Sequence, residues 1–171
     1  MTLIDPVRIM TRAVLALKEL QTSETWKAAL EGASLAPSPL LVHSIAATVE
    51  PRAALPARLP DYYIVSIARE SGTTGRFAHD AETGDLLEAE GVRKAGAYLT
   101  SYVDAPAIVR SRWPPPPGAA KIPLTADVVW KPCRESTSRF APFWRFNVEG
   151  QTVYVRADGV LFTELTTSGR G

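Results

Sequence analysis

The chain has 171 residues, 46% hydrophobic and 22% charged, so it can bury the core of one domain or of two small packed subdomains. Its 19 Lys and Arg residues balance 18 Asp and Glu residues, and this balance gives no overall field to attract nucleic acid or a membrane surface. A single Cys excludes an intrachain disulfide framework, and no apolar run of about 18 residues could span a membrane. The first residues do not resemble a signal peptide, so we expect a cytoplasmic protein.

The N-terminal residues predict helical structure. Asp5 can accept from the free amides of a first helical turn, and Pro6 gives up no needed hydrogen bond at the first helical position. Ser23 predicts a second start, ahead of a segment over residues 24–31 that Gly32 ends. One bent helix or two shorter helices fit this pattern. Apolar residues spaced by three and four predict the stripe that packs on a core: Val7, Met10, Val14, Leu17 and Leu20.

Residues 33–60 contain five prolines, which leave room for longer regular structure only over residues 40–49. Ser38 and Pro39 resemble a helix start, whereas β-branched residues such as Val42 are typical of a strand. Helix and strand both remain open here, and the capping pattern favours the helix.

A meander of short strands is predicted next. Residues 62–68 are β-branched and aromatic, which indicates a strand. The Gly- and Thr-rich residues 71–75 predict a turn, and a second strand follows over residues 76–81. Residues 82–84 then turn the chain into a return strand over residues 85–89.

Helical spacing of apolar residues returns after this meander. It predicts a helix over residues 92–103 that can extend past Pro106 to Arg112. Trp113 then precedes four prolines and a glycine, residues 114–118, which favour a stiff polyproline II linker.

This linker is the clearest candidate for a domain boundary. The prediction is an N-terminal part over residues 1–113, with helices and the first meander, and a C-terminal meander over residues 119–171. The alternative is that both parts pack as a single domain.

The C-terminal part reads as an antiparallel meander. Asp158-Gly159 between alternating segments is a strong hairpin signal. Four strands are predicted, over residues 128–133, 143–148, 152–157 and 160–165. Alternation places two sets of side chains on opposite faces of the sheet: Trp144, Phe146, Val148, Val153, Val155 and Ala157 on one, and Phe143, Arg145, Tyr154 and Arg156 on the other.

The two meanders share a sequence pattern. Residues 61–71 can be superimposed on residues 126–136 at a constant offset, and both stretches end in Arg-Glu-Ser. A second pattern links Phe77, Asp80 and Gly84 to the residues around Asp158-Gly159. Two related helix-plus-meander halves are therefore one interpretation, and chance similarity of two strands that end in polar turns is the other.

Residues 77–87, with the sequence FAHDAETGDLL, resemble the strand, Asp-Ala-x-Thr-Gly turn and strand of PepSY-type domains. These are small helix-plus-meander modules with a cystatin-like shape. The resemblance covers about residues 62–90 and, loosely, 153–165. It implies a non-catalytic module that binds or inhibits peptides, proteases or assembly partners, although those domains usually act outside the cell.

The only Cys and the two histidines are candidates for chemistry. Arg134 next to Cys133 could lower the thiol pKa, and with His43 or His79 as base a cysteine-dependent enzyme can be drawn. No helix N-terminus is predicted behind Cys133, and lone cysteines are commonly small buried hydrophobes. Neither histidine has a second ligand at metal-binding spacing, so no metal site is expected, and His79 is predicted to point to solvent.

Arg-Glu pairs close both echoed strands. Arg69-Glu70 and Arg134-Glu135 could present a fixed fork of donors to an anionic ligand, but a structural ion pair at the strand end is the favoured interpretation.

Cations and aromatics interleave on the C-terminal sheet. Single-stranded nucleic acid uses this combination, but the charge balance argues against such a role, and a protein interface fits the same residue types. The predicted binding residues are Arg134, Glu135, Arg139, Phe143, Arg145, Tyr154 and Arg156.

The sequence therefore predicts an α+β protein of helices packed on antiparallel meanders. We expect a non-enzymatic protein-binding or assembly module that acts through the Arg/aromatic sheet face or an open strand edge. It would need no cofactor or metal and would bind neither nucleic acid nor membrane. A small cysteine-dependent enzyme and a structural subunit of a homo-oligomer or larger complex are the alternatives.

Overall fold

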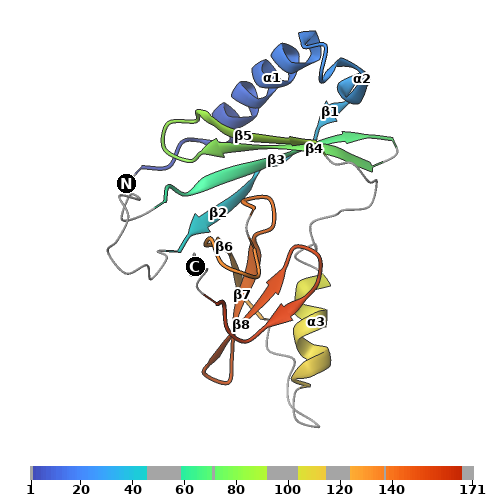
Figure 1. Cartoon of the computed structure of the whole chain (residues 1–171). Coiled ribbons are helices and arrows are strands. Elements are labelled where there is room, and N and C mark those ends of the chain that lie inside the picture. The colour runs from blue at the N-terminus through green and yellow to red at the C-terminus, as the bar shows by residue number, and fades with distance from the viewer. Residues whose placement is uncertain are drawn as a thin grey trace. The chain divides into compact units, whose positions relative to one another are not determined.

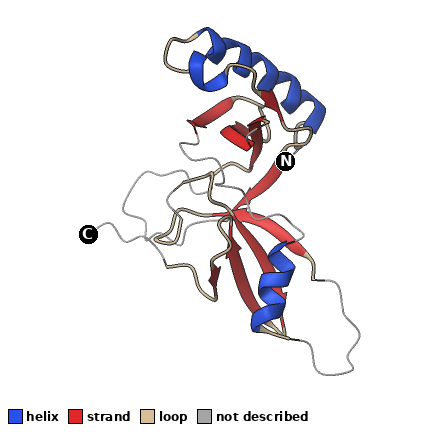
Figure 2. Cartoon of the chain, turned by 90° about the vertical axis from the view of Figure 1, so that its right-hand side faces the viewer, coloured by secondary structure: helices blue, strands red, loops and turns tan. Residues whose placement is uncertain are grey.

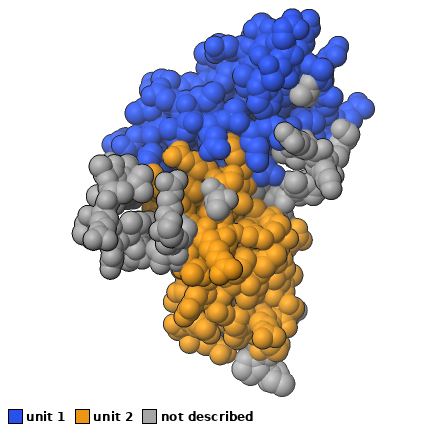
Figure 3. Space-filling model, viewed as in Figure 1, with its two compact units in different colours: residues 1–42, 60–97 blue, residues 43–59, 98–171 orange. Residues whose placement is uncertain are grey.

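The computed structural model describes residues 2–45, 59–70, 72–91, 104–114, 124–136 and 138–166. The chain divides into two compact units (Figure 3): unit 1 is Met1–Val42 with Pro60–Ala97, and unit 2 is His43–Leu59 with Tyr98–Gly171. Helices and mostly antiparallel strands make up both, which confirms the α+β class.

Unit 1 begins with α1 (Pro6–Thr22), followed by the short α2 (Lys27–Leu30). The predicted start is confirmed, because Asp5 accepts a hydrogen bond of 2.8 Å from the Val7 amide and Pro6 stands at the first helical position. The chain forms two helices and not one bent one.

The buried stripe of α1 differs from the predicted one. Ile9, Ala13 and Leu17 are buried, whereas Val7 is 71% and Val14 is 41% exposed. The prediction is confirmed for Met10, Leu17 and Leu20, which pack against the core, and is wrong for Val7 and Val14.

Antiparallel strands form the sheet of unit 1, and the first three residues of β2 belong to it. The strands are β1 (Ser34–Leu35), β2 (Leu40–Ser44), β3 (Tyr62–Arg69), β4 (Gly72–Asp80) and β5 (Leu86–Gly91). The helix favoured over residues 40–49 is wrong for 40–44, because residues 40–42 pair with β3 and residues 43–44 with residues 129–130, and residues 46–49 lie outside the described part. Val42 is fully buried in this strand, where a β-branched side chain packs well.

The strand over residues 62–68 is confirmed, and the predicted turn over residues 71–75 is shorter than expected. β4 already begins at Gly72, which pairs with Arg69. Gly72 has a φ of 115°, a conformation that suits glycine. The turn between β3 and β4 is therefore short, and residues 73–75 already belong to β4.

The core of unit 1 lies between α1 and one face of the sheet (Figure 1). α1 packs across β3 and β4. The buried side chains of the strands on this face are Tyr63, Val65, Ile67 and Phe77. Each of the larger ones contributes roughly 1.5 to 3 kcal/mol by leaving water, so this layer holds the unit together.

Unit 2 contains α3 (Asp104–Arg112) and the strands β6 (Ala126–Trp130), β7 (Phe143–Val148), β8 (Gln151–Arg156) and β9 (Leu161–Phe162). The last two residues of β2, His43 and Ser44, pair in parallel with Val129 and Trp130. The four predicted strands are confirmed as elements, with shorter first and last members.

Two tight turns set the register of this sheet. Glu149 and Gly150, with φ values of 52° and 80°, form a two-residue turn between β7 and β8 that matches the strand twist. At the predicted Asp158-Gly159 hairpin, Gly159 has a φ of 87° and the Arg156 amide donates to the Val160 carbonyl at 2.8 Å. The predicted alternation is confirmed, since Trp144 is opposite Val155.

α3 confirms the helix up to Arg112, while residues 92–103 lie outside the described part. Ala105 and Val109 are its buried side chains, and the helix packs on β8 (Figure 2). α3 therefore lies in unit 2, although the predicted boundary placed it with residues 1–113.

The two halves of the sequence echo match different strand positions. Residues 61–71 and 126–136 match β3 with β6, the first strand of each meander. The Asp80 and Asp158 turns match the end of β4, the second strand, with the end of β8, the third. One register does not superimpose both meanders, so duplication stays a hypothesis.

Candidate functional site

Arg156, a predicted binding residue, is held inside unit 2. Its Nε and Nη2 donate to the two carboxylate oxygens of Asp158 at 2.9 and 2.7 Å, and Nη1 donates to the Glu135 carbonyl. Its guanidinium also lies 5.4 Å from the centre of the Phe162 ring. The hydrogen bonds to Asp158 raise the pKa of Arg156 and lower that of the carboxyl. Arg156 thus fastens the β8–β9 hairpin to the loop after β6.

Glu135 is also a structural residue. Its carboxylate accepts from the backbone amide of Thr166 at 2.9 Å and from the Thr166 hydroxyl, and the Arg134 amide donates to the Thr166 carbonyl at 3.2 Å. Slight burial raises the pKa of Glu135, but the hydrogen bonds from Thr166 outweigh it and lower the pKa overall. The expected ion pair between Arg134 and Glu135 is not formed, because the Glu135 carboxylate bonds to Thr166 and the Arg134 side chain is exposed.

The corresponding Arg69 also binds a backbone group. Its Nη2 donates to the Ala28 carbonyl at 2.8 Å, which fastens the end of β3 to α2. Arg69 and Glu135 thus make structural contacts, but neither forms the expected Arg-Glu ion pair.

Two further predicted binding residues pack on aromatic rings. Arg139 lies 5.8 Å above the Trp130 ring. Phe143 is fully buried and makes edge contacts with Tyr154 and Phe162, with ring centres 6.1 and 6.0 Å apart. The placement of Phe143 at a surface was therefore wrong, because the β9 segment covers this end of the sheet face.

Cys133 is 1% exposed and exchanges backbone hydrogen bonds with Ser136. Burial raises the pKa of the Cys133 thiol, and a hydrogen bond with the Glu135 carboxylate raises it further. A raised pKa favours the protonated thiol, which is a poor nucleophile. This environment gives no support to a cysteine-dependent enzyme.

His79 is buried in unit 1, at 1% exposure, so its predicted solvent exposure was wrong. Its Nδ1 lies 3.1 Å from the Gly84 carbonyl, while Nε2 is buried without a hydrogen-bond partner. Burial lowers the pKa of His79 and keeps the ring neutral. Over the described ranges, no group of three or more His, Cys, Asp or Glu side chains could hold a metal.

The remaining two predicted residues, Arg145 and Tyr154, line a groove of about 370 Å³ on the sheet of unit 2. They face one another across β7 and β8, and Asp127 on β6 stands opposite Arg145 on the other side. Arg145 Nη2 donates to Asp127 Oδ2 at 2.7 Å, with the two side chains 40% and 60% exposed. We call this surface the polar groove; Thr125, Asp127, Arg145, Asn147, Thr152 and Tyr154 give it its polar side chains.

Strand register explains why these side chains meet. Asn147 and Thr152 form the second residue pair from the two-residue turn, and each lies two positions from Arg145 or Tyr154 on the same face. Both therefore line the groove together with Tyr154. The sequence reasoning missed Asp127, Asn147 and Thr152, although the alternation around Arg145 and Tyr154 would have placed the last two on this face.

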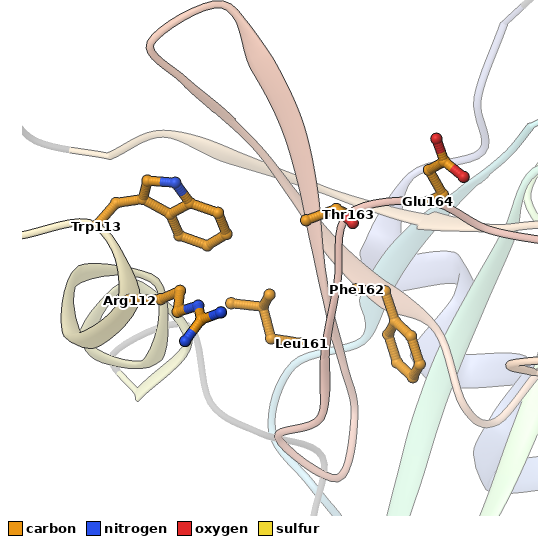
Figure 4. Close-up of a pocket in the computed structure, with 6 residues that line it drawn as sticks. All are labelled: Arg112, Trp113, Leu161, Phe162, Thr163 and Glu164. Atoms are coloured by element: carbon orange, nitrogen blue, oxygen red, sulfur yellow. The ribbon is translucent and has the colours of Figure 1, made fainter.

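A second pocket, of about 570 Å³, lies in unit 2 between the end of α3 and the β9 segment (Figure 4). The Trp113 ring and the Leu161 side chain point toward the same space, whereas Phe162 points away from it. Arg112 and Glu164 give the pocket one charge of each sign. Sequence reasoning treated Trp113 only as the residue before the proline run.

No helix in the described residues is long and apolar enough to cross a membrane. Comparisons of the chain with protein-family models, with curated proteins and with solved structures gave no significant match.

Proposed function

We propose that this chain is a non-enzymatic protein-binding module and that the polar groove of unit 2 is its contact surface. The observation that carries the proposal is the pairing of Arg145 and Tyr154 in an open groove. Four of the other predicted binding residues are held by internal contacts, so Arg145 and Tyr154 are the two that stand together on an accessible surface.

The groove combines features typical of interface hot spots. Asp127 accepts a hydrogen bond from one nitrogen of the Arg145 guanidinium. The other N–H donors of Arg145 are thereby held in position, so the side chain loses little conformational entropy when a partner binds. Tyr154 adds a large flat surface with a polar end, and Tyr and Arg are enriched where interfaces bind tightly. The side chains of Asn147 and Thr152 can both donate hydrogen bonds to the backbone of a partner segment and accept them from it.

The PepSY-type resemblance supports the same class of function. Asp80 in that motif accepts from the Glu82 and Thr83 amides at 2.8 and 2.9 Å, so it shapes the turn between β4 and β5. A conformational role for this Asp agrees with a non-catalytic module that presents strands and loops to a protein partner.

Site-specific photocrosslinking tests the proposal. A photoreactive amino acid in place of Thr152 is expected to crosslink one protein in cell extract, and mass spectrometry identifies that partner. Arg145→Ala combined with Tyr154→Ala should weaken binding of the purified partner by tenfold or more, since truncating a hot-spot residue typically costs about 2 kcal/mol. Arg134→Ala, an exposed Arg outside the groove, is the matched control and should bind as the unaltered protein does.

The proposal fails if the double variant binds the crosslinked partner as tightly as the unaltered chain. It also fails if Arg134→Ala weakens binding to the same degree, because the effect would then follow from charge and not from the groove.

A subunit of a larger assembly is the second candidate, and the outer face of α1 favours it. Val7, Val14 and Leu15 are 71%, 41% and 61% exposed on one helix of 17 residues. Apolar exposure concentrated on one element is typical of a surface that a partner covers. This candidate predicts that the mass of the particle in solution rises with concentration.

A further inference from the structure

β5 is an edge strand of the unit 1 sheet. It pairs with β4 and with no other strand that the structure describes. In an antiparallel sheet, every second residue of an edge strand directs its N–H and C=O away from the neighbouring strand. Leu86 and Leu87 are 44% and 37% exposed, and the neighbouring strands that the structure describes lie only on the β4 side of β5. β5 therefore offers backbone donors and acceptors to a further strand.

Two of the usual protections of an edge are missing from β5. Lys and Pro, which commonly block edge-to-edge pairing, are absent from its sequence LLEAEG. The irregularity against β4 affects only the start of the strand, and from Glu88 to Gly91 the register is regular. A regular stretch of this kind can template another strand.

The two faces of β5 differ in chemistry. Ala89 is opposite Phe77 and packs with the core under α1. Glu88 and Glu90 are opposite Ala78 and Arg76, on the other face of the sheet. Arg76 lies 4.0 Å from Glu90, while Glu88 is exposed and makes no ion pair within the described residues. An added strand would meet carboxylates on one face and apolar groups on the other.

This pattern disfavours a second copy of the chain as the occupant. When two β5 strands pair antiparallel with like faces together, the two longest registers place Glu88 opposite Glu88 or opposite Glu90. Like charges directly opposite one another destabilise a strand pair, whereas opposite charges stabilise it. A strand with Lys or Arg at these positions would form attractive cross-strand pairs, whereas a second β5 would form repulsive ones.

We propose that the β5 edge binds an extended peptide segment as an additional strand, with basic side chains opposite Glu88 and Glu90 and apolar side chains alternating with them. Backbone hydrogen bonds supply the affinity and the two carboxylates select the segment. The proposal concerns unit 1 and is independent of the polar groove.

The probe is a short synthetic peptide of alternating valine and lysine, labelled for fluorescence anisotropy. It is expected to bind the full chain, while the matching valine-glutamate peptide should not. Glu88→Lys should weaken binding of the lysine peptide about tenfold and improve binding of the glutamate peptide, since it turns one cross-strand attraction into a repulsion. Glu82→Lys makes the same change of net charge in the exposed turn before β5, and it should bind within about twofold of the unaltered chain.

Two further measurements separate strand addition from simple charge attraction. A lysine peptide N-methylated at alternate residues should lose binding, because it cannot form the ladder. Amide hydrogen exchange should slow in β5 when the unmethylated peptide binds. Equal binding of the methylated peptide, protection elsewhere, or equal effects of Glu82→Lys and Glu88→Lys would each overturn the proposal. Arg145→Ala with Tyr154→Ala should leave peptide binding unchanged, so failure of the polar groove remains distinguishable.

Discussion

His79 is a buried titratable residue of unit 1. The ring is buried in unit 1, bonds through Nδ1 to the Gly84 carbonyl and leaves Nε2 without a partner. Burial lowers its pKa, the hydrogen bond to Gly84 acts against this, Arg12 lowers the pKa and Asp85 raises it. The net effect keeps the folded chain from binding a proton that the unfolded chain binds readily.

This imbalance predicts a loss of stability in mild acid. Above the ordinary His pKa of about 6.5, the His79 ring is neutral in both the folded and the unfolded chain, so its burial costs no stability through protonation. As pH falls below that value, the unfolded state takes up the proton first, so the free energy of unfolding decreases. Urea denaturation at several pH values measures this slope, and His79→Gln should flatten it. An unchanged slope in that variant would assign the acid sensitivity to other groups.

Residue-level prediction succeeded where strand alternation decided the outcome. Arg145 and Tyr154 were placed on one open face because a period of two and a Gly-containing turn specify it. Glu135 and Phe143 were placed less well, since their partners, Thr166 and the β9 segment, come from distant positions in the chain. Side-chain pairing over such distances leaves no local signal.

α1 illustrates the same limit at the scale of an element. Its start was predicted from Asp5 and Pro6, but the apolar period fits more than one stripe. Ala13, and not Val14, faces the sheet. A larger side chain there has no space, whereas the neighbouring position is open.

Ala13→Leu is therefore expected to destabilise the protein by about 1 to 3 kcal/mol through overpacking against the sheet. Val14→Ala is the matched change at the next position, and it should stay within about 0.5 kcal/mol of the unaltered chain because Val14 is exposed. Urea midpoints of the two variants provide the comparison. Equal losses would mean that the helix packs through the predicted stripe.

β2 shows why one element was assigned to the wrong class. Ser38 and Pro39 do resemble a helix start, yet residues 40–42 pair with β3 and residues 43–44 pair with β6. Tertiary pairing outweighs a weak local preference in a segment this short. The longer strands β3 and β7 carry enough β-branched and aromatic residues for sequence and tertiary structure to agree.

At the scale of the whole molecule, the exposed apolar residues of α1 bear on the state of the protein in solution. If a second subunit covers Val7 and Leu15, sedimentation velocity should show a mass that rises with concentration. Val7→Ser with Leu15→Ser should then keep the chain monomeric over the same range. A single monomeric species for both proteins would remove the assembly candidate and leave the binding module.

The path of the chain through its two units constrains how the protein folds during synthesis and where it can be truncated. Unit 1 closes only when residues 60–97 join residues 1–42, and unit 2 takes residues 43–59 as well as the C-terminal part. During synthesis, His43 and Ser44 emerge long before Val129 and Trp130, their partners in β6. Long-range pairing of this kind slows folding. Truncation at any point between residues 60 and 97 leaves both units incomplete, so cutting the chain there does not yield two separately folding fragments.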